Sequence, residues 1–305
     1  MSMVVIGTIF VDVKGFPADV YIPGGRNAGR IEEVHGGVSR NVAENIARSG
    51  FNPTFLSLVD NSGAAVAVLS RLEAEGVNTK YIKTTSDGMG TWLAIFDHTG
   101  EVVASLSKRP NFQPLAEVIR QQGDDIFGDC DSILLEIDIE EAVVTETFKY
   151  AKKYNKKVYA LISNMTIALE RMEYIRECEC FVCNQQEAGI FFGENLESAT
   201  PEEMAAILSE KVKAAGMKSM IVTMADKGAA YADCSGNHGV CSAEKVNVVD
   251  TTGAGDAFFS GMAMGLTCGK TMAESCAIGT KIAAAVICTT ENTCPTFTKA
   301  ELGLE

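Results

Sequence analysis

The sequence predicts an α/β fold in which a mainly parallel sheet is covered by helices on both faces. Short β-rich runs alternate with helical patterns along most of the 305 residues, and this alternation is typical of βαβ units. Two stretches, at about 10–35 and 90–107, interrupt the alternation with extended runs of their own. No internal repeat, low-complexity segment or linker divides the chain, so we expect one domain over residues 1–305.

The elements of the main sheet follow from the hydrophobic pattern. The run MVVIG predicts a buried first strand, and SRNVAENIARSG predicts the helix after it, with Gly50 where that helix ends. The later helix TPEEMAAILSEKVKAAG begins with Thr200 as its N-cap and Glu203 as its capping-box acid. Further strands are predicted at residues 132–137, 157–162, 180–184 and 219–224.

The two interrupting stretches predict a small antiparallel sheet outside the main one. In the first, FVDVKGF and RIEEVH flank the glycine-rich PGGRNAG. In the second, GTWLAIFDHTGEVVASLS reads as two extended runs joined by the hairpin signal DHTG. A single layer of strands has an apolar face to bury. We therefore expect this sheet to cover a site or to pair with a second subunit.

The charge balance excludes some partners. The formal charge is −14, from 26 basic and 40 acidic residues. A general nucleic-acid binder or a protein that binds acidic membranes needs a basic face, which this composition disfavours. A polyanionic ligand would have to be held locally, by backbone amides, a few cations or a metal.

The N-terminus and the cysteines predict a cytoplasmic protein. The start MSMVVIGTIFVD lacks a basic segment followed by a cleavage site, and no apolar run approaches the length of a membrane span. In a reducing compartment the ten cysteines are expected to be free thiols. The one cluster, Cys178, Cys180 and Cys183, lacks a fourth ligand at a standard zinc spacing, so we interpret it as thiols around a buried strand.

The stretch DTTGAGDAFFSG, residues 250–261, carries the strongest chemical signal. It follows the β-rich KVNVVD and precedes apolar residues at helical spacing, which places Gly253, Ala254 and Gly255 at a helix N-terminus. Free amides and the positive end of the helix dipole suit an anion there. A carboxylate beside a bound anion, here Asp256, makes sense as the base in phosphoryl transfer. The Rossmann and Walker patterns do not fit this sequence.

Two motifs resemble the signatures of the ribokinase-like (PfkB) carbohydrate kinase family. VVDTTGAGDAFFSG resembles its C-terminal signature, and HGGVSRNVAENIARSG resembles its N-terminal one. The two lie more than two hundred residues apart in the expected order. The resemblance implies a ribokinase-like three-layer sandwich with a small antiparallel β lid inserted at about 10–35 and 90–107. It also implies a kinase that uses ATP with Mg²⁺, and in many members the lid forms a homodimer.

The resemblance also implies roles for single residues. Asp256 would be the base that deprotonates a hydroxymethyl group of the substrate. The backbone of Gly253, Ala254 and Gly255 would stabilise the charge on the transferred phosphoryl group. The positions that hold substrate hydroxyls are matched by Asp12, Gly36, Gly37 and Asn41.

Three further stretches resemble the family's nucleotide and ion sites. In NQQEAG, Asn184 and Glu187 would help to place Mg²⁺, although this pair could also simply cap the next helix. VTMADKGA, which contains Thr223 and Gly228, resembles the loop along the nucleotide, with Ala225 where many members have glycine. The monovalent-cation (K⁺) site of several members is partly matched by Asp250, Thr252 and carbonyls near TTENTCPTF.

The sequence indicates the type of reaction more directly than it indicates the substrate that accepts the phosphoryl group. GRIEEVHGGVSRNVAENIA, LAIFDHTGEVVAS and the motif GGVSRN resemble the pseudouridine kinase branch, which implies a 5′-phosphorylated nucleoside as product. The alternatives are a free-sugar kinase of the fructose or ketodeoxygluconate type and, in another class, a non-catalytic sugar or nucleotide sensor on the same fold. Trp92, the only tryptophan, predicts either a buried apolar wall or a surface that stacks on a substrate ring.

Overall fold

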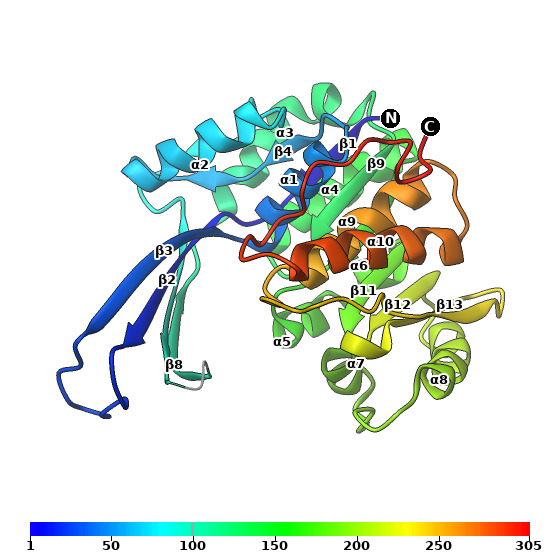
Figure 1. Cartoon of the computed structure of the whole chain (residues 1–305). Coiled ribbons are helices and arrows are strands. Elements are labelled where there is room, and N and C mark those ends of the chain that lie inside the picture. Colours follow the sequence, from blue (N-terminus) through cyan, green and yellow to red (C-terminus); the bar gives the residue numbers. More distant parts are fainter. Residues whose placement is uncertain (99–100) are drawn as a thin grey trace.

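The computed structural model describes residues 1–98 and 101–305 and confirms the predicted α/β fold (Figure 1). Eight strands form the main sheet in the order β14-β13-β12-β11-β10-β9-β1-β4. The strands from β12 to β4 are parallel, and β13 and β14 continue the sheet antiparallel. Their bounds are β1 Met3–Ile6, β4 Thr54–Leu56, β9 Ser132–Glu136, β10 Lys157–Leu161, β11 Cys180–Asn184, β12 Ser219–Thr223, β13 Ala229–Asp233 and β14 His238–Cys241.

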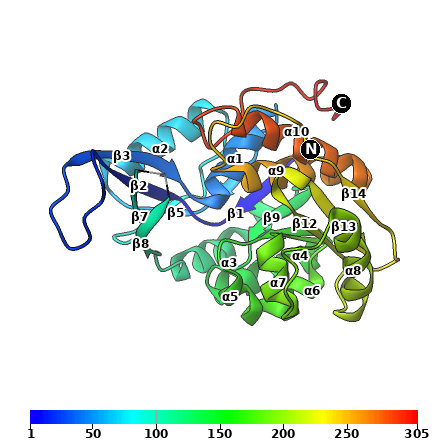
Figure 2. The same cartoon turned by 60° about the horizontal axis from the view of Figure 1, so that its bottom comes forward.

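Two hydrophobic cores lie on opposite faces of this sheet. Successive side chains of a strand point to opposite faces, so Val4 and Ile6 pack into one core and Met3 and Val5 into the other. The first core is covered by α3 Gln113–Phe127, α4 Glu141–Tyr154, α5 Met165–Ala168, α6 Met172–Glu177, α7 Gln185–Phe192 and α8 Pro201–Ala214. The second is covered by α1 Val38–Arg48, α2 Gly63–Ala74, α9 Ala254–Thr267 and α10 Met272–Ile287 (Figure 2).

The predicted helix ends are confirmed where a cap residue marked them. Thr200 accepts from the backbone of Glu203, and the Glu203 side chain accepts from the backbone of Thr200, which is the expected capping box. Gly50 follows the end of α1 with φ +82°, a conformation that favours glycine. The thiols of Cys178, Cys180 and Cys183 are buried around β11, as the apolar pattern predicts.

A second, four-stranded sheet projects from this body, and we call it the lid sheet (Figure 1). Its order is β3-β2-β7-β8, with bounds β2 Phe10–Pro17, β3 Gly29–Gly36, β7 Gly90–Phe96 and β8 Val102–Lys108. The outer pairs are antiparallel as expected, but the central pair β2–β7 is parallel. Both central strands run outward from the body, and β3 and β8 return. The predicted DHTG turn includes residues 99–100, which lie outside the described residues.

The remaining elements are short. Strands β5 Leu58–Val59 and β6 Lys83–Thr84 form a two-stranded sheet, and the 3₁₀ helices are η1 Leu169–Arg171 and η2 Ala225–Lys227. Within the described ranges, none of the helices has both the length and the apolar character that crossing a membrane requires.

Candidate active site

The turn at residues 35–37 between β3 and α1, which we call the acceptor turn, brings the backbone close to the start of the lid sheet. Gly37 has φ +97° and forms the N-cap of α1; a Cβ there would lie 2.6 Å from the Thr8 carbonyl oxygen. A Cβ on Gly36 would overlap the carboxylate of Asp12. Position 37 therefore requires glycine, and a Cβ at position 36 would displace the Asp12 carboxylate, which lies over the turn. The structure thus brings three of the predicted acceptor residues together.

Asn41 joins this turn to the predicted base. Its side-chain Nδ2 donates to Oδ2 of Asp256 at 2.6 Å. Asn41 is only 5% exposed, and its Oδ1 is buried with no hydrogen-bond partner among the described residues. A buried amide oxygen without a partner is costly. A hydroxyl group of a bound acceptor would satisfy it.

Asp256 has the acidity of a general base. Burial raises the pKa of Asp256 from 3.8 to about 7. The Asn41 hydrogen bond lowers this pKa, the charge of Glu136 raises it, and the charges of Arg40 and Asp12 act in opposite directions. A base whose pKa lies near neutral pH can take a proton from an alcohol and release it again. Asp256 lines a cavity of about 200 Å³ and does not face a closed interior.

The amides predicted as an anion cradle, those of Gly253, Ala254 and Gly255, lie at the start of α9 beside Asp256. Gly253 has φ +82° and is the N-cap of α9. The Ala254 N–H donates to the Thr251 carbonyl at 3.2 Å, so it closes the turn. The amides of Gly255 and Asp256 belong to the first turn, where no preceding helical carbonyl can accept from them. These amides and the helix dipole favour an anion at this point.

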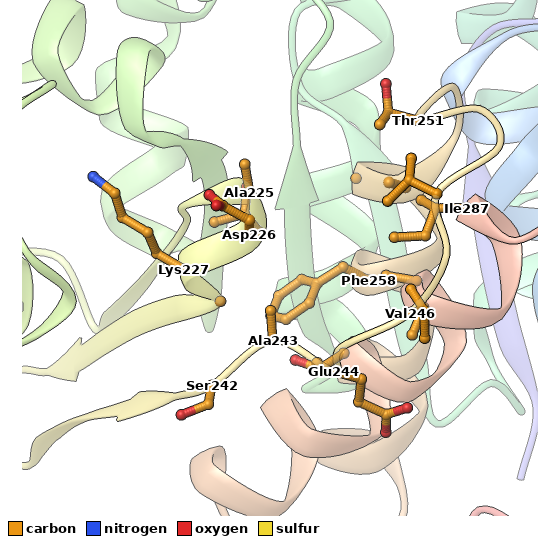
Figure 3. A pocket seen from close by; sticks show the side chains of 18 of the residues that line it. Ala225, Asp226, Lys227, Ser242, Ala243, Glu244, Val246, Thr251, Phe258 and Ile287 are labelled. Atoms are coloured by element: carbon orange, nitrogen blue, oxygen red, sulfur yellow. The ribbon is translucent and has the colours of Figure 1, made fainter.

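A larger cavity of about 970 Å³ meets the small one at this cradle. Residues that line both are Asn184, Thr223 and Gly255. In Figure 3, Phe258 and Val246 lie across the cavity from the η2 residue Ala225. Its size suits a ligand as large as a nucleotide, whose phosphates would reach the cradle.

The loop after β12 approaches this cavity closely. Gly228 has φ +97°, and a Cβ there would overlap the Cys241 carbonyl, so glycine is required. Ala225 has φ +51°, one of two positive values among the described non-glycine residues. The chain therefore adopts a left-handed backbone turn at Ala225, at the cost of strain in an alanine.

Asn184 and Glu187 form the capping box of α7. The Asn184 side chain accepts from the Glu187 N–H, and the Glu187 side chain accepts from the Asn184 N–H, each at 2.8 Å. Both also line the small cavity with Asp256. Burial raises the pKa of Glu187. No group of three or more histidine, cysteine or acidic side chains that could hold a metal is found in the described part of the chain. This sparse set fits Mg²⁺, which keeps waters and binds phosphate oxygens.

The predicted monovalent-cation residues form a local turn. Oδ1 of Asp250 accepts from the Thr252 N–H at 2.9 Å. In the loop near TTENTCPTF, whose carbonyls are predicted as further ligands, the Glu291 side chain pairs with Arg71 at 2.9 Å.

A buried carboxylate that no motif marked, that of Glu136, lies close enough to Asp256 for its charge to act on it. Glu136 ends β9 and is fully buried. It accepts from the Thr8 N–H at 2.8 Å and from the hydroxyls of Ser39 and Ser163 at 2.9 and 3.1 Å. Burial, followed by the charge of Asp138, raises the pKa of Glu136. The available signal was an acid at the carboxyl end of the apolar run SILLE, where parallel strands place ligand-binding residues.

Aromatic side chains line the face of the lid sheet that carries Asp12. Asp12 pairs in register with Trp92, so both side chains project to the same face. Trp92 packs edge-on against Phe96 at 6.4 Å, and Phe96 stacks on Phe16 at 4.9 Å. Trp92 is half-buried, so it is not simply a closed apolar wall.

Comparison with known proteins identifies the family of this chain. The model of the pfkB family carbohydrate kinases matches residues 1–298. The guanosine-inosine kinase of Exiguobacterium acetylicum is 33% identical over 293 residues, covering 95% of this chain and 96% of that protein. The pseudouridine kinase of Escherichia coli is 26% identical, covering 90% and 86%.

Solved structures show the same fold. The ribokinase of Arabidopsis thaliana, complexed with ribose and ATP, superposes with a TM-score of 0.82 at 19% identity, covering 99% of this chain and 98% of that one. The ribokinase of Thermotoga maritima gives 0.79 at 23% identity, covering 99% and 98%. The chain therefore belongs to the pfkB family of carbohydrate kinases and is a phosphotransferase with an alcohol group as acceptor.

Proposed function

We propose that this kinase transfers the γ-phosphoryl group of ATP to the 5′-hydroxymethyl group of a nucleoside. The observation that carries the proposal is the position of Asp256, which accepts from Asn41 beside the acceptor turn, lines the small cavity and adjoins Gly255, where the two cavities meet. The oxygen of the acceptor hydroxyl attacks the γ-phosphorus while Asp256 takes the hydroxyl proton. The bond between the γ-phosphorus and the oxygen that bridges it to the β-phosphate breaks, and ADP leaves. Acceptor hydroxyls bind to Asp12, Asn41 and the Gly36–Gly37 turn.

The cradle and the nucleotide cavity position the donor. The N–H groups of Gly255 and Asp256, held by the turn at Gly253 and Ala254, stabilise the negative charge on the transferred group. Thr223 and Gly228 border the bound nucleotide. Asn184 and Glu187 would hold Mg²⁺, largely through water, and the ion would supply positive charge that neutralises the phosphates. Their capping contacts fix the two side chains at the cavity and are compatible with this role.

Two observations support a nucleoside as the acceptor. The aromatic face next to Asp12 suits a base that stacks on Trp92, whereas a free hexose offers no such ring. Guanosine-inosine kinase and pseudouridine kinase are also among the relatives. The higher identity to the former favours a purine nucleoside, and pseudouridine, which the motif GGVSRN indicates, is the second candidate.

A substrate panel with the variant Asp256→Asn tests the proposal. We expect guanosine or inosine, with pseudouridine next, to be phosphorylated in the presence of ATP and Mg²⁺. Ribose, fructose and ketodeoxygluconate should react poorly. In Asp256→Asn, turnover should fall by about 10²–10⁴-fold or more while nucleoside binding survives. Turnover of a free hexose alone would refute the nucleoside assignment. Binding without turnover in the unmodified protein would indicate the sensor instead.

A monovalent cation is a separate proposal. The turn at Asp250 and Thr252 lies next to the cradle and offers carboxylate and carbonyl oxygens, which suit K⁺. If K⁺ binds there, activity should be higher in potassium than in choline chloride. Equal activity in both salts would refute this part of the proposal.

We also propose a homodimer through the lid sheet. The face opposite Asp12 carries exposed apolar side chains, with Ile31 76%, Leu106 70% and Leu93 40% exposed. A second copy of the chain would cover this face. Sedimentation should show a dimer, and Ile31→Lys should produce monomers.

A further inference from the structure

A fully buried arginine joins two parts of the site that lie far apart in the sequence. Arg40 is the third residue of α1, and its side chain is 0% exposed. Its guanidinium donates to four acceptors, which are the carbonyls of His35 and Gly36, the Glu44 carboxylate at 2.9 Å and Oδ1 of Asn292 at 3.2 Å. A rigid fork of donors is what allows one side chain to hold several fixed acceptors at once.

Asn292 carries the connection onward to the anion cradle. Its Nδ2 donates to the His35 carbonyl at 2.8 Å, so its side chain both gives and accepts a hydrogen bond at the acceptor turn. Its own backbone carbonyl packs directly against Gly253, where a Cβ would overlap it. One residue therefore touches the Arg40 guanidinium, the acceptor turn and the start of α9.

The loop around Asn292 has no regular secondary structure, and polar contacts attach it to the body. Arg71 bridges Glu44 at 2.6 Å and Glu291 at 2.9 Å. Two more contacts are Thr293 Oγ1 to Glu44 Oε1 at 3.0 Å and Cys294 N–H to Asn45 Oδ1 at 2.7 Å. Four successive loop residues are thus tied to α1, directly or through Arg71.

We infer that Arg40 is a positioning residue that, through Asn292, fixes the acceptor turn and the phosphate cradle relative to each other. The inference rests on the proposed phosphoryl transfer between these two parts. Arg40 touches neither reactant; it acts on the carbonyls of His35 and Gly36 and on the loop that supports Gly253. Phosphoryl transfer depends on alignment, and a displacement of about 1 Å can cost about 10²-fold in rate.

The kinetic test uses three variants and one control. Asn292→Ala and Arg40→Lys should each lower kcat about 10- to 100-fold, while the KM values of nucleoside and ATP change less than about 3-fold. The double variant should be no slower than the slower single variant, because both changes break one connection. The control Glu75→Gln removes the Arg48–Glu75 ion pair at the outer side of the same cluster and should leave kcat unchanged. Additive losses, or an equal loss in the control, would overturn the inference.

An amide hydrogen-exchange measurement separates this inference from the proposed function. In Asn292→Ala and in Arg40→Lys, the segments 35–37 and 251–256 should both exchange faster, and in Glu75→Gln neither should. Faster exchange in only one of the two segments would overturn the connection. If no nucleoside or sugar is phosphorylated by the unmodified protein, the proposed function fails, and the exchange result still decides whether Arg40 joins the two parts.

Discussion

The body and the lid sheet hold their site residues in different ways. In the body, Asn41, Glu136 and Arg40 are buried and fixed by hydrogen bonds to neighbouring elements. In the lid sheet, every residue of β8 is exposed, and Trp92 is held mainly by aromatic contacts. Buried hydrogen bonds leave the side chains of the body little freedom to move. The lid sheet is exposed and joins the body only where its strands enter and leave, so it can tilt. We therefore expect the body to set the geometry of the reaction and the lid sheet to select and enclose the acceptor.

Gly253→Ala should disturb the reaction geometry held by the body, and it has the largest expected effect. An alanine Cβ would overlap the Asn292 carbonyl, and φ is +82° at this position. We expect kcat to fall about 10²-fold because the cradle must shift. Gly24 in the lid-sheet loop is the matched control, since it has φ +72° and nothing within 4 Å of an added Cβ. Backbone strain in Gly24→Ala should lower its folding stability by about 1 kcal/mol and leave its kcat unchanged. Similar kcat losses in both variants would contradict the comparison.

Removing the aromatic ring of Trp92 tests whether the lid sheet binds the base of the nucleoside. Trp92→Ala should raise the KM for the nucleoside about 10- to 100-fold, because base stacking contributes about 1–3 kcal/mol per base. Its effect on kcat at saturating nucleoside should be smaller. Leu93→Ala alters the neighbouring residue on the opposite face and serves as the control. An unchanged KM in Trp92→Ala would show that the base does not lie on this ring.

The raised pKa of Asp256 predicts opposite effects of pH on activity and stability. With a pKa of about 7 in the folded, unliganded protein, kcat/KM should rise with pH through neutrality as the carboxyl loses its proton. The unfolded chain loses this proton near 3.8, so between about 4 and 7 the folded protein binds more protons and loses stability as the pH rises. Asp256→Asn has no carboxyl to titrate and does not lose stability in this way. The melting temperature of the variant minus that of the unmodified protein should therefore increase from pH 5 to pH 8. A constant difference across this range would contradict the raised pKa.

Local signals predicted much of this site, and long-range contacts could not be predicted. The glycines at 37, 228 and 253 and the start of α8 at Thr200 depend on nearby backbone, so the sequence marks them directly. Arg40 and Asn292 are 252 positions apart, and neither belongs to a pattern that points to the other. The parallel pairing of β2 with β7 likewise depends on which strands the body sends outward, and hydrophobic alternation does not encode that choice.

The smallest expected effect concerns strain beside the nucleotide cavity. Ala225 has φ +51°, where an L-residue with a Cβ is strained by about 1–2 kcal/mol. Ala225→Gly removes the strain but adds backbone freedom to the unfolded chain, which costs about 0.5–1 kcal/mol, so the net gain should be at most about 1.5 kcal/mol. Thermal unfolding should show a slightly higher melting temperature with unchanged kcat. Asn155, at φ +51° in the αL cap of α4, is the comparison, because asparagine tolerates this conformation. Asn155→Gly should therefore give no gain, and an equal gain at both positions would show that Ala225 stores no strain of its own.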